Sequence, residues 1–188
     1  MGTADVNVGS QDERDFKIVL VDNNVVIERW LEIEAAIRDA FAPAEFSDPT
    51  RTTESVLQYV QRGLDGKLRP VLGHVLAISA TDKVVGAVFC VPTGREPGET
   101  SCDIGYIFTS PQVGGRIRLD MLNRLMSLVF DTLRSCGFER IVTDMGTVAG
   151  AKTIGRRFFV NAPTPEKSNR WVRELQDDGR PRPGAGVG

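Results

Sequence analysis

The sequence predicts a single α/β (α+β) domain, in which about four helices flank a mixed, mostly antiparallel twisted sheet of about six or seven strands. Two apolar, β-branched runs, 71–79 and 84–91, are separated only by a short polar break, which is typical of a β-hairpin. A long amphipathic helical pattern over 119–136 lies between two further strand patterns. The 188 residues are 41% hydrophobic, enough for one buried core.

The first half of the chain predicts a strand and two helices before the hairpin. Residues 16–21 form a short apolar strand, and Asp22-Asn-Asn24 supplies a turn and a helix cap. A helix follows with one apolar face and ends at Pro43; that face holds Ile27, Trp30, Leu31, Ile37 and Phe41. The second helix begins at Thr52 or Thr53 and ends near Gly63, with Val56, Leu57 and Val60 turned inward.

The second half continues with alternating strands and helices. A strand over 102–109 is stopped by Pro111. The helix over 119–136 ends at Gly137, a residue suited to a left-handed cap, and its apolar stripe begins at Leu119. A strand over 138–145, a short helix over 149–157 and a strand over 158–160 follow, while 169–175 fits either a helix or a strand. The order combines antiparallel strands with a βαβ unit, so the sheet is mixed.

Composition limits the class of protein. The 23 basic and 25 acidic residues give a net charge of -2, so no nucleic-acid partner is expected. No apolar run approaches the roughly 20 residues that cross a bilayer, so no membrane partner is expected either. Three cysteines without a Cys-x-x-Cys pair, and a polar N-terminus without a signal-peptide pattern, predict a cytoplasmic protein. With one histidine, no metal is expected.

Both ends of the chain lack the pattern of a packed element. Residues 1–14 show no hydrophobic periodicity, and residues 176–188 are rich in proline and glycine. We therefore expect flexible tails at 1–14 and 176–188 and a single domain over 15–175.

The segment Asp103 to Arg118 carries the strongest indication of chemistry. A strand is followed by Pro111, a Gly114-Gly115 pair and then a helix. The free amides of a helix N-terminus attract anions, and glycines let a phosphate approach the backbone closely. Arg116 and Arg118 add positive charge. This segment is neither a P-loop nor a dinucleotide-binding Gly-x-Gly-x-x-Gly motif, and a plain strand-to-helix turn is the alternative interpretation.

The order of elements and this segment resemble the GNAT acyltransferase superfamily over roughly residues 16–175. The resemblance rests on Asp103-Ile-Gly105, Pro111, Gln112-Val-Gly-Gly115, the long helix and Gly137-Phe138. It implies an acyltransferase that uses acetyl-CoA or another acyl-CoA as co-substrate. The implied contacts are pantetheine on the backbone of Ile107, Phe108 and Thr109, and pyrophosphate on the following loop, with Gln112, Gly114, Gly115, Arg116, Ile117 and Arg118 as its residues.

The sequence departs from the family pattern in two places. If Pro111 fixes the register, Gly114 stands where the family has Arg or Gln, and Ile117 stands at the second small position. Residues 149–155 contain no asparagine, and no tyrosine follows Tyr106, whereas the family usually protonates the leaving thiolate with a tyrosine near there. The proton source therefore stays open between another side chain and water.

Asp103 is the predicted catalytic residue, because relatives carry an acidic residue on this strand and a carboxylate can deprotonate an amine directly or through water. Competing carboxylates are Glu96 and Glu99 on the preceding loop. The resemblance places the acceptor wall between the first two helices, where Glu45 and Asp48 could attract a cationic amine or be solvated. His74 is the remaining base, although a histidine in an apolar strand is more often structural. The cysteines are expected in the core or at a helix C-terminus, which disfavours an acyl-cysteine intermediate.

Three functions remain open at the level of sequence. The first is N-acyl transfer from an acyl-CoA to a small-molecule amine by direct transfer in a ternary complex. The second takes the acyl group from the phosphopantetheine arm of an acyl carrier protein, as in natural-product biosynthesis. The third is a non-catalytic acyl-CoA-binding or assembly module. A homodimer is one of the open oligomeric states.

Overall fold

The computed structural model describes residues 15–166 and 169–175, so the tails predicted at 1–14 and 176–188 lie outside the described residues. The strands form two four-stranded sheets with the orders β1-β2-β3-β5 and β4-β6-β8-β7. All pairs are antiparallel except β4 with β6. The strands are β1 (Phe16–Val21), β2 (Leu72–Ser79), β3 (Val84–Pro92), β4 (Ser101–Cys102), β5 (Ile107–Thr109), β6 (Arg140–Asp144), β7 (Val160–Asn161) and β8 (Arg170–Glu174). The predicted mixed, mostly antiparallel architecture is confirmed.

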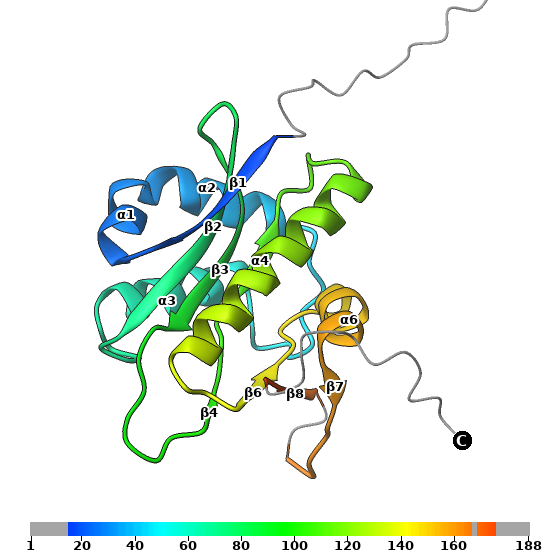
Figure 1. Ribbon diagram of the computed structural model, residues 1–188. Helices are drawn as coiled ribbons and strands as arrows, with labels where there is room; N and C mark the ends of the chain where they lie inside the picture. Colours follow the sequence, from blue (N-terminus) through cyan, green and yellow to red (C-terminus); the bar gives the residue numbers. More distant parts are fainter. Residues whose placement is uncertain (1–14, 167–168, 176–188) are drawn as a thin grey trace, which may run out of the picture.

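Helices cover both faces of the first sheet (Figure 1). The long helix α4 (Gly115–Ser135) crosses one face, and α1 (Asn23–Glu28), α2 (Trp30–Phe41) and α3 (Thr53–Leu64) pack on the other. Side chains of β2 alternate between the two layers, with Val75 and Ala77 in the α4 core and Leu76 and Ile78 in the opposite core. After β6 the chain forms α5 (Val148–Gly150), a π-helical turn η2 (Ala151–Gly155) and α6 (Arg156–Phe158).

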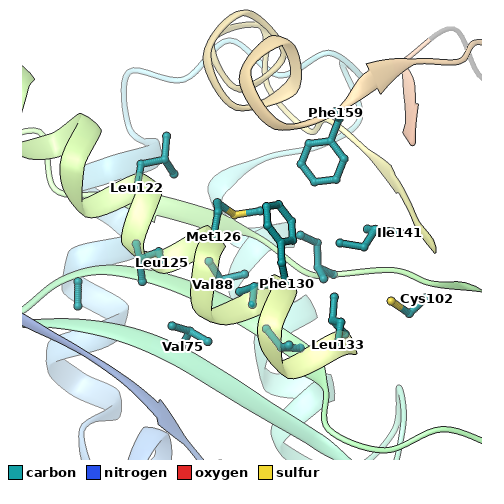
Figure 2. Close-up of a cluster of buried hydrophobic side chains, with 14 of the residues drawn as sticks. Val75, Val88, Cys102, Leu122, Leu125, Met126, Phe130, Leu133, Ile141 and Phe159 are labelled. Atoms are coloured by element: carbon teal, nitrogen blue, oxygen red, sulfur yellow. The ribbon is translucent and has the colours of Figure 1, made fainter. Parts of the chain in front are cut away.

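One hydrophobic core joins the two sheets through α4 (Figure 2). Met126 and Phe130 of α4 point from the helix toward Ile141 of β6 and Phe159, which follows α6. Phe130 meets the Phe159 ring edge-on at 6.3 Å between centroids. The two sheets therefore share one core although their strands are not continuous.

The first predicted helix is broken at Arg29, which corrects the predicted apolar face. Ile27 and Leu31 are 53% and 84% exposed, and the buried residues are Val26, Ile33, Ile37 and Phe41. Arg29 has φ -101° and ψ 15°, so the turn there shifts the phase of the helix.

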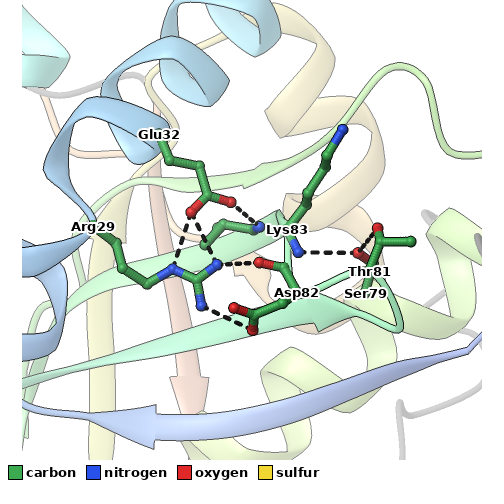
Figure 3. Close-up of polar contacts among 7 residues, drawn as sticks. Arg29, Glu32, Ser79, Thr81, Asp82 and Lys83 are labelled. Carbon is green, nitrogen blue, oxygen red and sulfur yellow. Dashed lines mark hydrogen bonds and ion pairs between the residues drawn. The ribbon is translucent and has the colours of Figure 1, made fainter.

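The contacts of Arg29 explain the break (Figure 3). Its guanidinium donates to Glu32 and to both the carbonyl and the carboxylate of Asp82 in the β2–β3 turn. Glu32 in turn accepts a hydrogen bond from the Val84 backbone N–H. A tertiary contact to the hairpin therefore fixes the helix boundary.

The long helix also differs from its prediction. It begins at Gly115 rather than at Leu119, and Leu119 is 48% exposed. The predicted inward residues from Leu122 to Leu133 are buried. The earlier start places Gly115 to Arg118 in the first helical turn, at the segment that carries the predicted chemistry.

Candidate functional site

The two sheets separate where the chain passes from β4 to β5. Ser101 and Cys102 of β4 pair in parallel with Arg140 and Ile141 of β6. The chain then leaves β6, and Ile107 to Thr109 pair with β3 instead. The strand predicted over 102–109 is therefore two strands that belong to different sheets. We call the gap between β5 and β6 the wedge.

A β-bulge produces this separation. Phe89 of β3 donates its N–H to the Tyr106 carbonyl at 3.0 Å and accepts from the Gly105 N–H at 2.9 Å, so two residues lie opposite one. A Cβ on residue 105 would lie 2.6 Å from the Phe89 carbonyl oxygen, too close for any side chain, which explains why this residue is a glycine. Because a bulge bends its strand, the chain turns away from β6 at this point.

One edge of β5 offers backbone groups to the wedge. The Tyr106 carbonyl accepts from Phe89, and the Ser110 N–H donates to the Val85 carbonyl at 2.7 Å. Since backbone groups alternate along an antiparallel strand, residues 106, 108 and 110 face β3. Ile107 and Thr109 therefore direct their N–H and C=O groups toward the wedge, whereas Phe108 directs its backbone to β3.

The loop after β5 ends at an open helix N-terminus. Gly114 caps α4 without a side-chain hydrogen bond, and the first turn holds no acidic residue. Added Cβ atoms at Gly114 and Gly115 would meet nothing within 4 Å. The first three amides of a helix have no partner within it, and those of α4 belong to Gly115, Arg116 and Ile117. This end of α4 can receive an anion.

The charged and polar residues predicted to bind the pyrophosphate differ in exposure and in contacts. Arg116 is exposed and Arg118 is half-buried in the first turn of α4. The Gln112 side chain instead donates to Asp39 of α2 at 3.5 Å. The Gln112 side chain is therefore directed to α2, whereas the amides of the first turn of α4 have no partner within the helix.

Three pockets surround the bulge. A narrow one of about 50 Å³ lies in the wedge between Ile107 and the segment from Met145 to Ile154. Two larger pockets of about 350 and 460 Å³ share Tyr59, Asp103, Thr143 and Asp144. Tyr106 and Asp144 line both the narrow pocket and the 350 Å³ pocket. A ligand in the wedge and a second ligand in the larger pockets would thus meet near these two residues.

Two tyrosines are in contact beside the 350 Å³ pocket: Tyr59 also lines the 460 Å³ pocket, and Tyr106 also lines the narrow pocket. The rings of Tyr59 on α3 and Tyr106 meet edge-on, with centroids 5.4 Å apart. Arg51 donates a hydrogen bond to the Tyr106 hydroxyl at 3.4 Å. Burial, followed by the charge of Asp103, raises the pKa of Tyr59, so its phenol stays protonated at neutral pH.

Asp103 lines both larger pockets, and its Oδ1 accepts the Ile104 N–H at 2.8 Å. This places the predicted base at the point where the two sheets separate. Asp103 thus lines the two larger pockets, Ile107 lines the narrow pocket in the wedge, and Gly114 and Gly115 lie farther along the chain at the start of α4.

The competing carboxylates are either held by hydrogen bonds or exposed outside the pockets, and Glu99, which is held, lines the 460 Å³ pocket. Arg69 holds Glu99 with two hydrogen bonds of 2.7 and 2.8 Å, which lower the pKa of Glu99 to about 2. Asp48 accepts from the hydroxyl and the N–H of Thr50, and its pKa is lowered by these bonds. Glu45 and Glu96 are exposed and line none of the three pockets.

His74 is a structural residue. It is fully buried, its Nε2 lies 2.9 Å from the Asn23 Oδ1, and its Nδ1 accepts the Cys90 N–H at 3.3 Å. Both ring nitrogens are therefore used by the neutral imidazole. Burial lowers the pKa of His74 from 6.5 to about 4.

This histidine predicts a pH dependence of stability. In the unfolded chain the His74 imidazole binds a proton near pH 6.5, and in the folded chain only near pH 4. The neutral imidazole therefore contributes its full stabilisation above pH 6.5, and this contribution is lost as the pH falls toward 4. We expect the free energy of unfolding to fall by about 3 kcal/mol across this window, as measured by urea denaturation. His74→Gln should remove most of this slope, and an unchanged slope in that variant would contradict the assignment.

Two of the three cysteines, Cys90 and Cys102, are poor nucleophiles. Burial raises the pKa of Cys90 and of Cys102 to about 12, so neither is a thiolate at neutral pH. All three cysteines are free thiols. Within 15–166 and 169–175 there is no group of three metal-ligating side chains and no helix long and apolar enough to cross a bilayer.

Sequence reasoning missed Tyr59, Arg62 and Asp144 as pocket residues. The signal for the first two was available, because Ser55, Tyr59 and Arg62 follow the i, i+4, i+7 spacing of one helix face. The apolar face of α3, with Val56, Leu57 and Val60, gives the stronger pattern in the same segment. Asp144 ends β6, and nothing in the local sequence distinguishes it from a solvated strand-end aspartate.

No protein-family model matches the chain, and no curated protein matches it in sequence. Its similarity to known proteins lies in the fold. The GNAT family N-acetyltransferase YhbS from Escherichia coli, solved with CoA, superposes with a TM-score of 0.56 at 16% identity, over 87% of this chain and 83% of that one. PaiA N-acetyltransferase from Thermoplasma acidophilum, also with CoA, gives 0.58 at 10% identity, over 85% and 99%.

The similarity extends to a eukaryotic enzyme. The catalytic domain of the Tetrahymena GCN5 histone acetyltransferase, in complex with coenzyme A, gives a TM-score of 0.56 at 11% identity, over 87% of this chain and 95% of that one. These three structures differ widely in sequence from this chain and share its architecture. The chain therefore has the fold of the GNAT N-acetyltransferases.

Proposed function

We propose that the protein is a GNAT-type N-acyltransferase that moves a short acyl group from an acyl-CoA to a small-molecule amine. The wedge is the observation that carries this proposal: after β4 the chain leaves β6, β5 directs the backbone of Ile107 and Thr109 toward the wedge, and the following loop leads into the open N-terminus of α4. A pantetheine arm is an extended amide chain that can pair with such an edge. Its phosphates suit the amides of Gly115, Arg116 and Ile117.

Direct transfer in a ternary complex fits the arrangement of the pockets. The wedge takes the donor, and the larger pockets take the amine from the other side of Tyr106 and Asp144. Asp103 removes a proton from the ammonium group, and the amine nitrogen attacks the thioester carbonyl carbon. The Ile107 N–H can stabilise the resulting oxyanion. The protonated thiols of Cys90 and Cys102 support this route over an acyl-cysteine route.

The leaving thiolate needs a proton when the carbon–sulfur bond breaks. The Tyr106 phenol is the candidate donor, because Tyr106 lines both the wedge pocket and the 350 Å³ acceptor pocket. It would replace the tyrosine that the family pattern places later in the chain. The nitrogen of the tetrahedral intermediate loses its second proton to solvent as the amide forms, and Asp103 releases the first proton to solvent after the reaction. The Tyr106 hydroxyl regains a proton from solvent, with Arg51 beside it to stabilise the transient phenolate.

The carrier-protein donor is the second candidate. Gly114, at the position where the family pattern has Arg or Gln, leaves the loop without a side-chain donor, and space is open around it. A phosphopantetheine arm carries one phosphate and no adenosine, so it needs fewer hydrogen-bond donors from this loop than coenzyme A does. The three free thiols fit the cytoplasm as the expected compartment for either donor.

Thermal unfolding with coenzyme A tests the proposal. A ligand at 100 times its dissociation constant should stabilise the folded chain by about 2.7 kcal/mol. Release of the coenzyme A thiol from acetyl-CoA in the presence of an amine panel should then show turnover.

The three functions give different results. Turnover with acetyl-CoA supports the proposal, and turnover only with an acylated carrier protein supports the second candidate. Stabilisation by coenzyme A without turnover of any amine, by either donor, would indicate a binding module and contradict an enzyme.

A further inference from the structure

One wall of the 350 Å³ pocket is a polar face of α3. Ser55, Gln58, Tyr59 and Arg62 line it at the i, i+3, i+4, i+7 spacing that places them on one side of a helix. Arg51, just before α3, extends the same wall. This wall contains two guanidinium groups and no carboxylate.

The opposite wall carries the opposite charge. It is formed by the separated strand from Asp103 to Tyr106 and by the end of β6, at Thr143 and Asp144. Its ionisable groups are two carboxylates and the Tyr106 phenol. Asp144 and Tyr106 also line the wedge pocket, so the acidic wall is the one nearer the acyl donor.

Arg62 differs from Arg38 and Arg69 in having no counter-ion among the described residues. Arg38 bonds to Glu34 and Glu54, and Arg69 bonds to Glu99 at 2.7 and 2.8 Å. The exposed Arg62 guanidinium makes no hydrogen bond or ion pair within the described part of the chain, although it faces the pocket. Arg51 makes one long ion pair, 3.9 Å to Asp48, besides its bond to Tyr106.

We infer that the acceptor amine also carries a carboxylate, so that the substrates are amino acids in the broad sense. The inference rests on the proposed acyl transfer. The ammonium end lies against Asp103 and Asp144, close to the thioester, and the carboxylate end lies against Arg62. Guanidinium groups bind carboxylates with paired hydrogen bonds, and a pocket of this volume accommodates a ligand of amino-acid size.

Other amines suit the pocket less well. A polyamine would place its second positive charge against Arg51 and Arg62, which repel it. A plain alkylamine would leave these guanidinium groups without a ligand. The opposed walls therefore select for an acceptor with one positive and one negative end.

A series of ω-amino acids tests the inference and measures the spacing of the two charges. Glycine, β-alanine, 4-aminobutyrate and 6-aminohexanoate are compared with the alkylamines that lack the carboxylate, and α-amino acids are compared with their decarboxylated amines. Binding is measured calorimetrically to the protein saturated with coenzyme A, and turnover is measured with acetyl-CoA. We expect at least one amino acid to bind and react at least about tenfold better than its matched amine, the effect of one charged hydrogen bond.

Arg62→Gln should lower the affinity and kcat/KM for that amino acid by about tenfold to a hundredfold, and should lower those of the matched amine much less. Lys67→Gln is the control, because it removes a cation beyond the end of the same helix, where Lys67 pairs with Asp65 outside the pocket. The control should preserve the preference.

The outcomes separate this inference from the proposed function. Acylation of amines with no preference for any amino acid would overturn the inference and leave the acyltransferase standing. Binding of an amino acid that depends on Arg62, without turnover, would support the acceptor pocket and contradict acyl transfer from acetyl-CoA. Failure of every amino acid to bind better than its amine would overturn the inference whatever the turnover.

Discussion

Replacing Gly115 by aspartate is expected to abolish donor binding, raising the dissociation constant for coenzyme A by at least about a hundredfold. Gly115 is the first residue of α4, and nothing lies within 4 Å of the position of an added Cβ. The new carboxylate would therefore occupy the space that we assign to a phosphate. Two anions at one helix N-terminus repel each other, and the fixed one excludes the ligand.

The folded state should tolerate Gly115→Asp. An acidic residue in the first turn of a helix interacts favourably with the helix dipole, and glycine has a low helix propensity. Thermal melting without ligand should thus show equal or higher stability. Gly115→Asn has nearly the same shape without the charge, and should lose much less affinity. Unchanged coenzyme A affinity in a folded Gly115→Asp variant would remove the α4 N-terminus from the donor site.

The fold could be predicted largely because its signals are local. The hairpin between β2 and β3 has a polar turn between β-branched runs, and α3 has a Thr52 cap and a buried apolar face. The break in the first helix could not be predicted from local sequence, because it depends on Asp82, more than 50 residues away from Arg29. The order of strands in two separate sheets is likewise a property of the whole chain.

The candidate site shows the same division between local and long-range signals. The glycines at 114 and 115 and the aspartate at 103 stand in one continuous segment, so their association could be recognised in sequence. The bulge could not, because it requires Phe89 of β3 to bond to both Gly105 and Tyr106. The 350 Å³ pocket also escaped prediction, since Arg62 of α3 and Asp144 of β6 are far apart in the sequence and line it together only in the folded chain.

The position of Asp103 predicts the second large effect. At neutral pH an alkylamine with a pKa of about 10 is almost entirely protonated, and roughly one molecule in 1,000 is ready to attack. A carboxylate that accepts the ammonium proton inside the complex removes this limitation. Asp103→Asn should therefore lower kcat/KM for the amine at pH 7 by about 10²- to 10³-fold, with the coenzyme A affinity changed little.

The pH profile distinguishes a base from a residue that only shapes the pocket. If Asp103 takes the proton, the wild-type kcat/KM is level around neutral pH and up to the pKa of the amine, because the reactive complex holds the same number of protons as the free reactants. In Asp103→Asn only the neutral amine reacts, so kcat/KM should rise about tenfold per pH unit until the amine pKa is reached. The two profiles then converge at high pH.

Asp144→Asn is the matched comparison, because Asp144 lines both larger pockets and the wedge pocket as well. If Asp144 binds the ammonium end without taking its proton, this variant should raise KM for the amine and keep the level profile. A steep profile in Asp144→Asn together with a level one in Asp103→Asn would transfer the role of base to Asp144. That result would move the proton acceptor to the end of β6, on the other side of the wedge, while leaving the donor site on β5 and α4 intact.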